Sequence, residues 1–209
     1  DIPYIVTLHD AWWICEHQFM LDSQGLERDY HQSDPLVAAR YTENIDVSLQ
    51  RRHYLAKYLN RAELLLSVSE FQAQLYAMNG FPQVKVNRNG IVTRPVLPKK
   101  TEGSNKICLG YAGGICVHKG YHFLKEAVVK AQLSNSEITV IDLFMNDSLT
   151  RKETWGTTSV TFIPKQSAEE MPKFFSQIDV LVAPSLWPES FGLITREAVY
   201  AEACAVAPD

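Results

Sequence analysis

One stretch constrains the fold of this chain more than any other: a short apolar run at residues 179–183 that leads through a turn into a helical pattern. The run is Asp-Val-Leu-Val-Ala, and a short apolar run bounded by turn signals is typical of a buried strand in a parallel sheet. Pro188 marks the turn, and we expect a helix to begin near Ser190 or Phe191, with the Ser190 hydroxyl as its N-cap. This strand–turn–helix order predicts an α/β protein.

The start of the predicted helix has the features of an anion-binding site. Gly192 falls in its first turn, where glycine weakens a helix but lets a ligand approach the backbone closely. The N–H groups of Phe191, Gly192 and Leu193 would face a ligand at the positive end of the helix dipole. Glu189 stands before the helix, and Glu197 is expected two turns inside it, roughly 9–10 Å along the axis. Both carboxylates suit a hydroxyl-rich ligand, although two ordinary solvated glutamates are the alternative.

The sequence from Glu189 to Ala198, E-S-F-G-L-I-T-R-E-A, resembles the Glu-x7-Glu signature of retaining glycosyltransferases of family four (glycosyl transferases group 1), which have the GT-B fold. The preceding apolar strand and Pro-Ser pair also follow the order of that family. The resemblance implies two Rossmann-like domains with parallel sheets. It also implies transfer of a sugar from a UDP- or GDP-linked donor to an acceptor hydroxyl, with retention of the anomeric configuration. The implied acceptor is a saccharide or a lipid-linked saccharide.

Composition is that of an ordinary globular protein, and it excludes several classes. The 209 residues are 46% apolar and 21% charged, enough for one large core or two small ones. The net charge of −4 gives no basic footprint for nucleic acid, and no apolar run is long enough to span a bilayer. The cysteines form no C-x-x-C pair, so we expect no zinc site and a reduced, cytoplasmic setting. They are Cys15, Cys108, Cys116 and Cys204.

The first part of the chain contains a second candidate for the site. Residues 2–8 are rich in strand-forming residues and end at His9-Asp10. Polar side chains at the carboxyl end of a parallel strand are where open α/β sheets contact their ligands, although a histidine that caps a turn is the alternative. The stretch T-L-H-D-A-W-W is similar to the end of the family's amino-terminal domain, which implies that His9 lies near the transferred sugar and the acceptor.

A helix is predicted over residues 46–62, where apolar residues recur at helical spacing. Its basic side chains are interpreted as a solvated face: Arg51, Arg52, Lys57 and Arg61. A basic face could instead favour an anionic membrane surface. Further along, strands are predicted at residues 63–68 and 84–86, with a helix at 69–78 between them.

The domain organisation follows from a change in composition. Residues 95–105 are rich in proline, glycine and charge, as is typical of an interdomain linker. Residues 1–94 would then be the last part of the amino-terminal, acceptor-side domain, and residues 106–209 the nucleotide-sugar-binding domain, truncated at its carboxyl end. The resemblance covers essentially the whole chain but only the middle of the family. We therefore expect both domains to be incomplete and the chain to be a fragment.

A glycine turn follows the first strand of the second domain. Residues 106–112 form that strand, Gly113 and Gly114 follow, and Lys119 precedes a helix over residues 121–131. Such a turn is where nucleotide-binding α/β domains meet phosphate. The family pattern is Gly-Arg-x4-Lys-Gly, and this chain keeps Lys119 but has Gly114 in place of the arginine. The loss of one charge-assisted contact would cost about 1.5–3 kcal/mol of donor binding.

Further strands are predicted at residues 137–144 and 160–163, followed by a helix over 167–177 with Ser167 and Glu170 as a capping box. The resemblance places the donor base against the backbone of the loop that contains Pro164. Residues 200–209 are expected to lead into one more strand.

The resemblance also implies a role for each site residue. Lys119 and the helix N–H groups would stabilise the leaving diphosphate, Glu197 would accept from the ribose, and Glu189 would orient the transferred sugar. No Asp-x-Asp occurs, so we expect catalysis without a metal and no cofactor besides the donor substrate. The enzyme would be a hexosyltransferase of polysaccharide biosynthesis, cytoplasmic or peripheral at the inner face of the membrane. Three alternatives stay open: an inactive nucleotide- or glycan-binding relative, an epimerase or phosphorylase of the same architecture, and a purely structural α/β protein.

Overall fold

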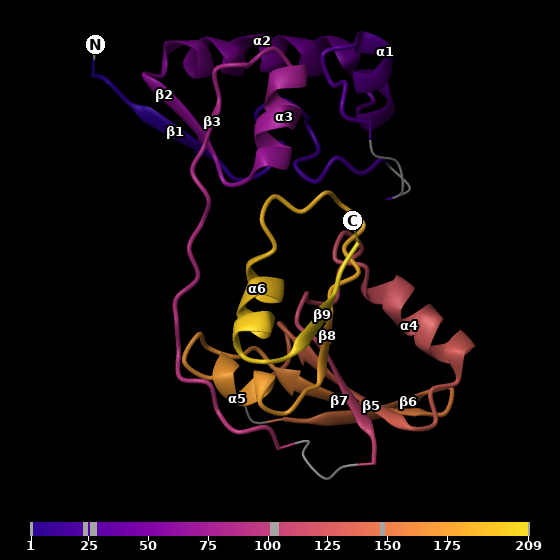
Figure 1. Cartoon of the computed structure of the whole chain (residues 1–209). Helices are drawn as coiled ribbons and strands as arrows, with labels where there is room; N and C mark the ends of the chain where they lie inside the picture. The colour runs from indigo at the N-terminus through magenta and orange to yellow at the C-terminus, as the bar shows by residue number, and fades with distance from the viewer. Residues whose placement is uncertain (1, 23–24, 26–28, 101–104, 147–148, 209) are drawn as a thin grey trace. The chain divides into compact units, whose positions relative to one another are not determined.

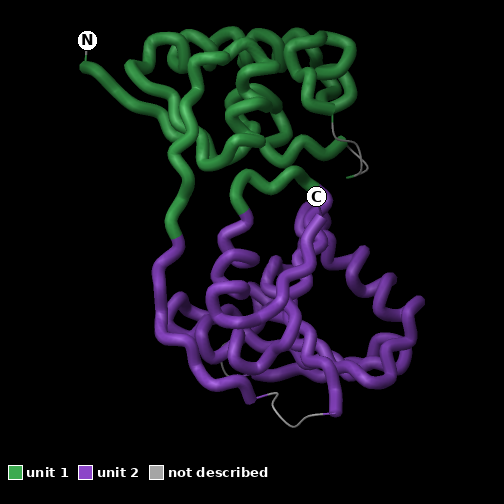
Figure 2. The backbone as a smooth tube through the Cα atoms, viewed as in Figure 1, with its two compact units in different colours: residues 1–90, 187–191 green, residues 91–186, 192–209 purple. Residues whose placement is uncertain are grey.

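The computed structural model describes residues 2–22, 25, 29–100, 105–146 and 149–208. By its internal contacts the chain divides into two compact units, which Figure 2 colours separately. Unit 1 comprises residues 1–90 and 187–191, and unit 2 comprises residues 91–186 and 192–209. Part of the predicted linker, residues 101–104, lies outside the described residues.

Unit 1 is built on a parallel sheet with the strand order β1-β2-β3 (Figure 1). Its strands are β1 (Ile5–Leu8), β2 (Leu64–Ser67) and β3 (Lys85–Val86). The helical elements are α1 (Pro35–Ala38), the 3-10 helix η1 (Ala39–Tyr41), α2 (Ile45–Arg61) and α3 (Glu70–Met78). Because α2 connects β1 to β2 and α3 connects β2 to β3, the unit has the repeated strand–helix–strand order that a parallel sheet requires.

The two longer helices of unit 1 begin where the sequence predicts. The Asn44 side chain accepts from the Val47 N–H at 3.2 Å, and the Ser69 hydroxyl accepts from the Gln72 N–H at 3.2 Å. Each contact satisfies one of the N–H groups that a helix start leaves without a backbone partner. The strands and helices pack around one apolar core, which includes Leu8, Leu59, Leu65, Tyr76 and Phe81.

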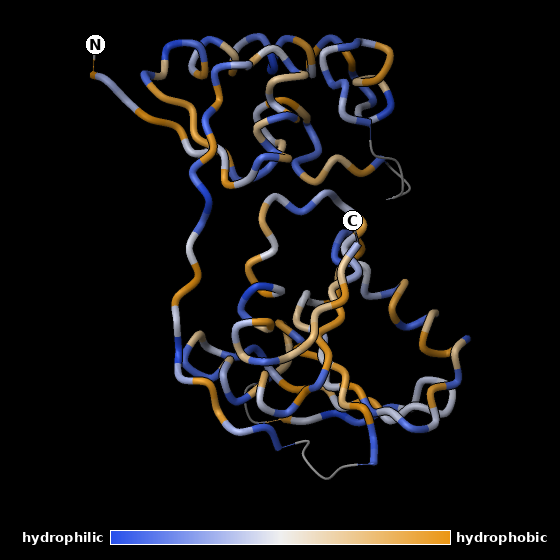
Figure 3. The backbone as a smooth tube through the Cα atoms, in the orientation of Figure 1, coloured by the Kyte–Doolittle hydropathy of each residue, from blue (hydrophilic) through white to orange (hydrophobic). Residues whose placement is uncertain are grey.

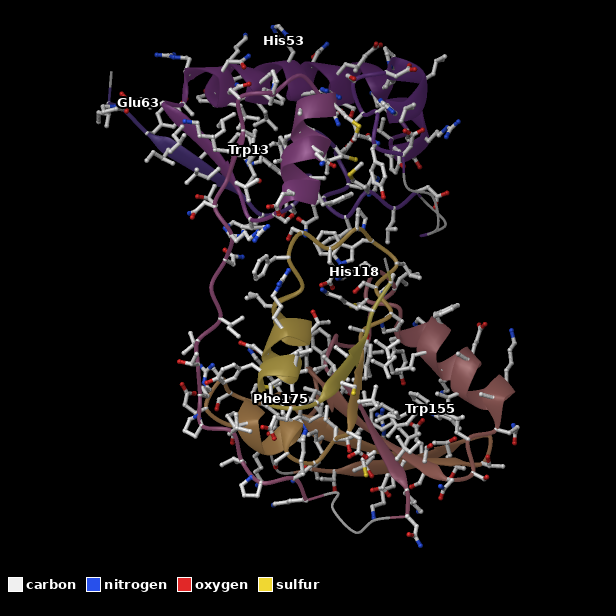
Figure 4. All side chains as sticks on the ribbon, viewed as in Figure 1. Trp13, His53, Glu63, His118, Trp155 and Phe175 are labelled. Atoms are coloured by element: carbon white, nitrogen blue, oxygen red, sulfur yellow. The ribbon has the colours of Figure 1, made fainter. Side chains whose placement is uncertain are left out.

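The basic face predicted for α2 is only partly solvated. The Arg51 guanidinium lies 4.1 Å from the centre of the Trp12 ring and donates to the Trp12 carbonyl at 2.6 Å. Arg52 donates to the carbonyl of Asn79 at 3.0 Å. These two side chains therefore pack within unit 1, and the interpretation of all four as a solvated face is wrong. The exposed outer side of the helix includes Lys57, Arg61 and His53, the last of which is labelled in Figure 4.

Unit 2 is built on a six-stranded sheet with the order β6-β7-β5-β4-β8-β9. The strands are β4 (Ile107–Tyr111), β5 (Ser136–Asp142), β6 (Arg151–Trp155), β7 (Thr158–Pro164), β8 (Val180–Val182) and β9 (Cys204–Val206). All neighbours are parallel except β6, which forms a hairpin with β7 through a turn at Gly156. The sequence does not predict β6, because four of its five residues are polar. A polar edge strand discourages pairing with other chains.

Helices cover both faces of this sheet (Figure 1). They are α4 (Tyr121–Ala131), α5 (Met171–Phe175) and α6 (Leu193–Tyr200). Tyr121, Leu124 and Val128 of α4 join one core cluster, whereas α5 and α6 contribute to a second cluster on the other face. Figure 4 labels Trp155 and Phe175, which belong to the first and the second cluster respectively. Figure 3 shows hydrophobic colouring along the central strands, as expected for strands covered on both faces.

Helix α5 is shorter than the predicted helix over residues 167–177. The capping interaction exists in part, since the Glu170 carboxylate accepts from the Ser167 N–H at 2.8 Å. This hydrogen bond holds the pKa of Glu170 below its usual value. Residues 168–170 form turns, however, and regular helix begins only at Met171. The local pattern therefore locates the first turn correctly but overestimates the length of the helix.

The segment that enters unit 2 is tied to the end of α5 by Lys99. Its ammonium donates to the carbonyls of Phe175 and Ile178, both at 3.0 Å. We expect Lys99→Met to lower the free energy of unfolding of unit 2 by about 1–2 kcal/mol, because hydrogen bonds from a charged group are lost while the aliphatic stem is kept. Urea unfolding measures the change, and Lys100→Met is the control. A loss no larger than that of the control would contradict this role.

Candidate functional site

The parallel strands of unit 2 bring several predicted site residues to one edge of the sheet. Strands β7, β5, β4 and β8 are neighbours in that order, so their carboxyl ends share an edge. Gly113, Gly114 and Lys119 follow β4, and Pro164 is the last residue of β7. Helix α6 follows β8. This edge is where open α/β sheets bind their ligands.

A tyrosine that the sequence analysis did not single out holds the glycine turn together. The Tyr111 hydroxyl lies 2.7 Å from the carbonyl oxygen of Gly114 and 3.2 Å from that of Lys119. Its side chain is buried at the last position of β4, so the two ends of the turn are fixed to the sheet. His118, labelled in Figure 4, lies in the same turn. The one signal in the sequence is an aromatic residue two positions before Gly113.

Glycine is favoured at two positions of this turn. A Cβ atom added to Gly120 would lie 1.9 Å from the Pro184 carbonyl oxygen, and the φ angle of Gly120 is +72°. A Cβ atom on Gly114 would lie 2.8 Å from Cδ1 of Leu143, and its φ angle is +76°. Side chains rarely adopt such φ angles. The turn after β4 thus lies directly against the loops after β8 and β5.

Both helices that begin at this edge lack a side-chain cap. Helix α4 follows Gly120 and helix α6 follows Gly192, each in the left-handed conformation and each without a side-chain hydrogen bond at the cap. Their first N–H groups can therefore donate to a ligand. Because α4 and α6 follow the neighbouring strands β4 and β8, two positive helix ends lie at this edge.

The predicted start of α6 is wrong. The helix begins at Leu193, and its N-cap is Gly192 rather than Ser190. The physical reason is the φ angle of +68° at Gly192, which interrupts the helix at this residue. Glu197 consequently lies four residues after the helix start, about 6 Å along the axis rather than two turns.

Glu197 lines a pocket between α5, α6 and the segment that follows unit 1 in sequence. The pocket is lined by Val92, Arg94, Pro95, Met171, Pro172, Phe175, Glu197, Tyr200 and Ala201. A single cation, Arg94, and a single carboxylate, Glu197, stand among mostly apolar lining residues. The carboxylate is thus available to a hydroxyl-bearing ligand from this side of α6.

The remaining predicted residues belong to unit 1. His9 is exposed directly after β1. The neighbouring Asp10 carbonyl accepts from the Gln72 amide at 3.0 Å and from the Tyr76 hydroxyl at 2.8 Å. Burial raises the pKa of Tyr76 well above its usual range, so the phenol keeps the proton that it donates. These contacts fix the chain at the carboxyl end of β1.

Residues 187–191, which include Glu189, Ser190 and Phe191, have their contacts in unit 1. The Trp187 ring lies 4.9 Å from the Phe19 ring in an edge-on arrangement. Ser190 lines a small pocket together with Asp10 and Gln72. The Glu-x7-Glu motif is therefore divided, with Glu189 in unit 1 and Glu197 in unit 2.

Neither a helix that could span a membrane nor a cluster of potential metal ligands occurs in the described part of the chain. No helix there is long and apolar enough to cross a membrane. No group of three or more histidine, cysteine, aspartate or glutamate side chains in the same residues could hold a metal ion.

The glycine turn and the two uncapped helices at the carboxyl edge of a parallel sheet are features typical of α/β proteins that bind phosphate. The family model described as glycosyl transferases group 1 matches residues 94–209, and the chain belongs to this family.

The similarity of the chain to solved structures shows that it has the GT-B fold. The structure of Anabaena HepE in complex with UDP and glucose is similar over 98% of this chain and 52% of that protein, with a TM-score of 0.60 and 19% identity. The structure of TarM is similar over 98% of this chain and 36% of that protein, with a TM-score of 0.61 and 10% identity. The chain thus spans about half the length of HepE.

One curated relative is similar in sequence. It is an uncharacterized 41.2 kDa protein in the cps region of Klebsiella pneumoniae, 31% identical over 93 residues. The similar segment covers 44% of this chain and 25% of that protein.

Proposed function

We propose that the chain belongs to an enzyme that transfers a sugar from a nucleotide diphosphate sugar to an acceptor hydroxyl, with retention of the anomeric configuration. The observation that supports this most is the pair of uncapped helix starts after β4 and β8, with Lys119 directly before Gly120. Two helix ends and an ammonium at one edge suit a diphosphate. The UDP complex of HepE supports a nucleotide donor.

The proposed roles follow from charge. The leaving diphosphate gains negative charge in the transition state, so Lys119 and the first N–H groups of α4 and α6 would stabilise it without rearrangement. Glu197 would accept from ribose hydroxyls. Glu189 and His9 would orient the transferred sugar and the acceptor. In this scheme no metal ion is needed, because Lys119 and the helix ends carry out its task.

The donor site would work without the arginine usual in the family. Gly114 has a left-handed φ angle, which is strained for an arginine, and the Leu143 side chain would have to move to admit one. The proposed diphosphate contacts thus depend on Lys119 and on backbone N–H groups.

A saccharide or lipid-linked saccharide is the proposed acceptor, and polysaccharide assembly the proposed pathway. The position of the Klebsiella relative in a cps region supports the pathway. A cytoplasmic location, with peripheral contact at the inner face of the membrane, is part of the same proposal. The surface that would make this contact is the outer side of α2, with Lys57 and Arg61.

The donor site can be tested by calorimetry and thermal shift with UDP, GDP and ADP. A nucleotide at 100 times its Kd should stabilise the protein by about 2.7 kcal/mol. We expect Lys119→Ala to weaken binding roughly 10- to 150-fold, since a hydrogen bond from a charged group is worth about 1.5–3 kcal/mol. Glu197→Ala should weaken nucleotide binding but leave pyrophosphate binding unaffected, because the proposed role of Glu197 is to contact only the ribose.

Lys130→Ala is the matched control, because Lys130 lies in the last turn of the same helix α4 that Lys119 precedes. An equal effect of the two lysine substitutions would argue against a diphosphate site at the glycine turn.

A second candidate function, a nucleotide-binding relative without turnover, is favoured by Gly114. It predicts nucleotide binding but no sugar transfer by the protein. If transfer occurs, NMR of the product's anomeric carbon would show whether the configuration is retained.

A further inference from the structure

Phe144 is the most exposed aromatic residue at the edge of the sheet where the donor is proposed to bind. It lies two residues after the end of β5, and 89% of its surface is accessible. A single exposed apolar side chain is common and needs no explanation by itself. Phe144 differs because of how its backbone is held and where it lies.

A buried carboxylate fixes the backbone of Phe144. Asp142 is 6% exposed, and its Oδ1 accepts from the Phe144 N–H at 3.0 Å. Its Oδ2 lies 3.9 Å from the Arg151 guanidinium. Arg151 in turn lies 4.1 Å from the centre of the Phe162 ring and 3.2 Å from the Glu153 carboxylate. Burying a charged group is costly, and here its hydrogen bond fixes a residue whose own side chain contacts almost nothing.

The turn that contains Phe144 follows the strand between the two strands whose loops are proposed to hold the donor. Strand β5 lies between β4 and β7, so the turn follows a strand whose two neighbours lead into the two loops, and paired strands lie about 5 Å apart. On one side, Leu143 borders Gly114 of the glycine turn. On the other side, Asp142 is the register partner of Pro164. Phe144 therefore follows the strand that separates the proposed diphosphate contacts from the proposed base contacts.

We propose that Phe144 stacks on the nucleobase of the donor. This inference rests on the proposed function, and it adds a side chain that selects for a nucleotide over a bare diphosphate. Every base has a π-face, and aromatic rings stack on it with little preference for its identity. Backbone groups of the Pro164 loop would then read the edge of the base.

Calorimetry on the whole chain tests the proposal with four probes: UDP, GDP, ADP and inorganic pyrophosphate. We expect Phe144→Ala to lower the affinity for the tightest-binding nucleotide roughly 5- to 150-fold, the range that corresponds to one base–aromatic stack. Pyrophosphate affinity should not change, because it has no base. Phe144→Tyr should restore nucleotide binding, and the Tm without ligand should stay the same in all variants.

Ile107→Ala is the control, because Ile107 is 51% exposed at the amino end of β4, the opposite edge of the sheet. If Phe144→Ala leaves nucleotide affinity unchanged while Lys119→Ala lowers it, the stacking proposal is wrong and the donor site stands. An equal loss for pyrophosphate would also overturn it, since Phe144 would then support the glycine turn rather than the base. If no nucleotide binds the wild-type chain, both the proposed function and this inference fall.

Discussion

Replacing Gly120 with alanine is expected to destabilise unit 2 by about 2–5 kcal/mol and to abolish nucleotide binding. The left-handed conformation costs an L-residue roughly 1–2 kcal/mol, and overpacking adds about 1–3 kcal/mol. The added Cβ would lie 1.9 Å from a backbone oxygen of Pro184, which no side-chain rotation can relieve. The turn after β4 or the loop after β8 must therefore move. Urea unfolding measures the first effect, and calorimetry with UDP and GDP the second.

Gly90→Ala provides the matched comparison, because nothing lies within 4 Å of a Cβ at Gly90 and its φ angle is not left-handed. Its effect should stay within about 0.5 kcal/mol, as for an ordinary surface substitution. If Gly120→Ala were as mild as Gly90→Ala, the close approach of the two loops would not exist in solution. If it lost stability but kept its affinity for nucleotide, the turn would not be part of the donor site.

Local patterns predict the helices that are determined by local chemistry. Helix α4 has the predicted bounds, because a glycine precedes it and an amphipathic pattern runs through it. Helices α2 and α3 follow the N-caps Asn44 and Ser69, each of whose side chains satisfies one of the first N–H groups. In these segments the intrinsic preference and the tertiary structure agree, which is the condition under which sequence patterns are informative.

Tertiary contacts decide the segments where prediction is wrong. Ser190 has the right chemistry for an N-cap, yet the helix begins three residues later, after the left-handed Gly192. Residues 187–191 instead have their contacts in unit 1, through groups such as Trp187. Arg51 has the pattern of a solvated residue but stacks on Trp12, 39 residues away in sequence. The sequence pattern marks Tyr111 only as a core residue. The hydrogen bond between its hydroxyl and the Gly114 carbonyl, which holds the glycine turn, is seen only in the structure. A one-dimensional pattern contains none of these partners.

Trp155→Ala is expected to cost about 3–5 kcal/mol of unit 2 stability, the range for truncation of a buried tryptophan. Trp155 is 1% exposed, and its ring lies 5.7 Å from that of Tyr121 and 6.1 Å from that of Phe162. Its indole N–H also donates to Glu153 at 3.1 Å. The substitution therefore leaves a cavity beneath α4 and removes one partner of a charged group. Urea unfolding of the variant measures the loss.

The same substitution links the edge hairpin to the proposed site, because Tyr121 is the first residue of α4. A cavity beside Tyr121 should loosen the helix start whose N–H groups would hold the diphosphate, so nucleotide affinity should fall together with stability. Trp155→Phe keeps most of the ring packing and loses the hydrogen bond, and it should cost only about 1–2 kcal/mol. If both variants lost the same stability, the hydrogen bond to Glu153 rather than the ring would be the main contribution. If Trp155→Ala kept full nucleotide affinity, the start of α4 would be fixed by the glycine turn alone.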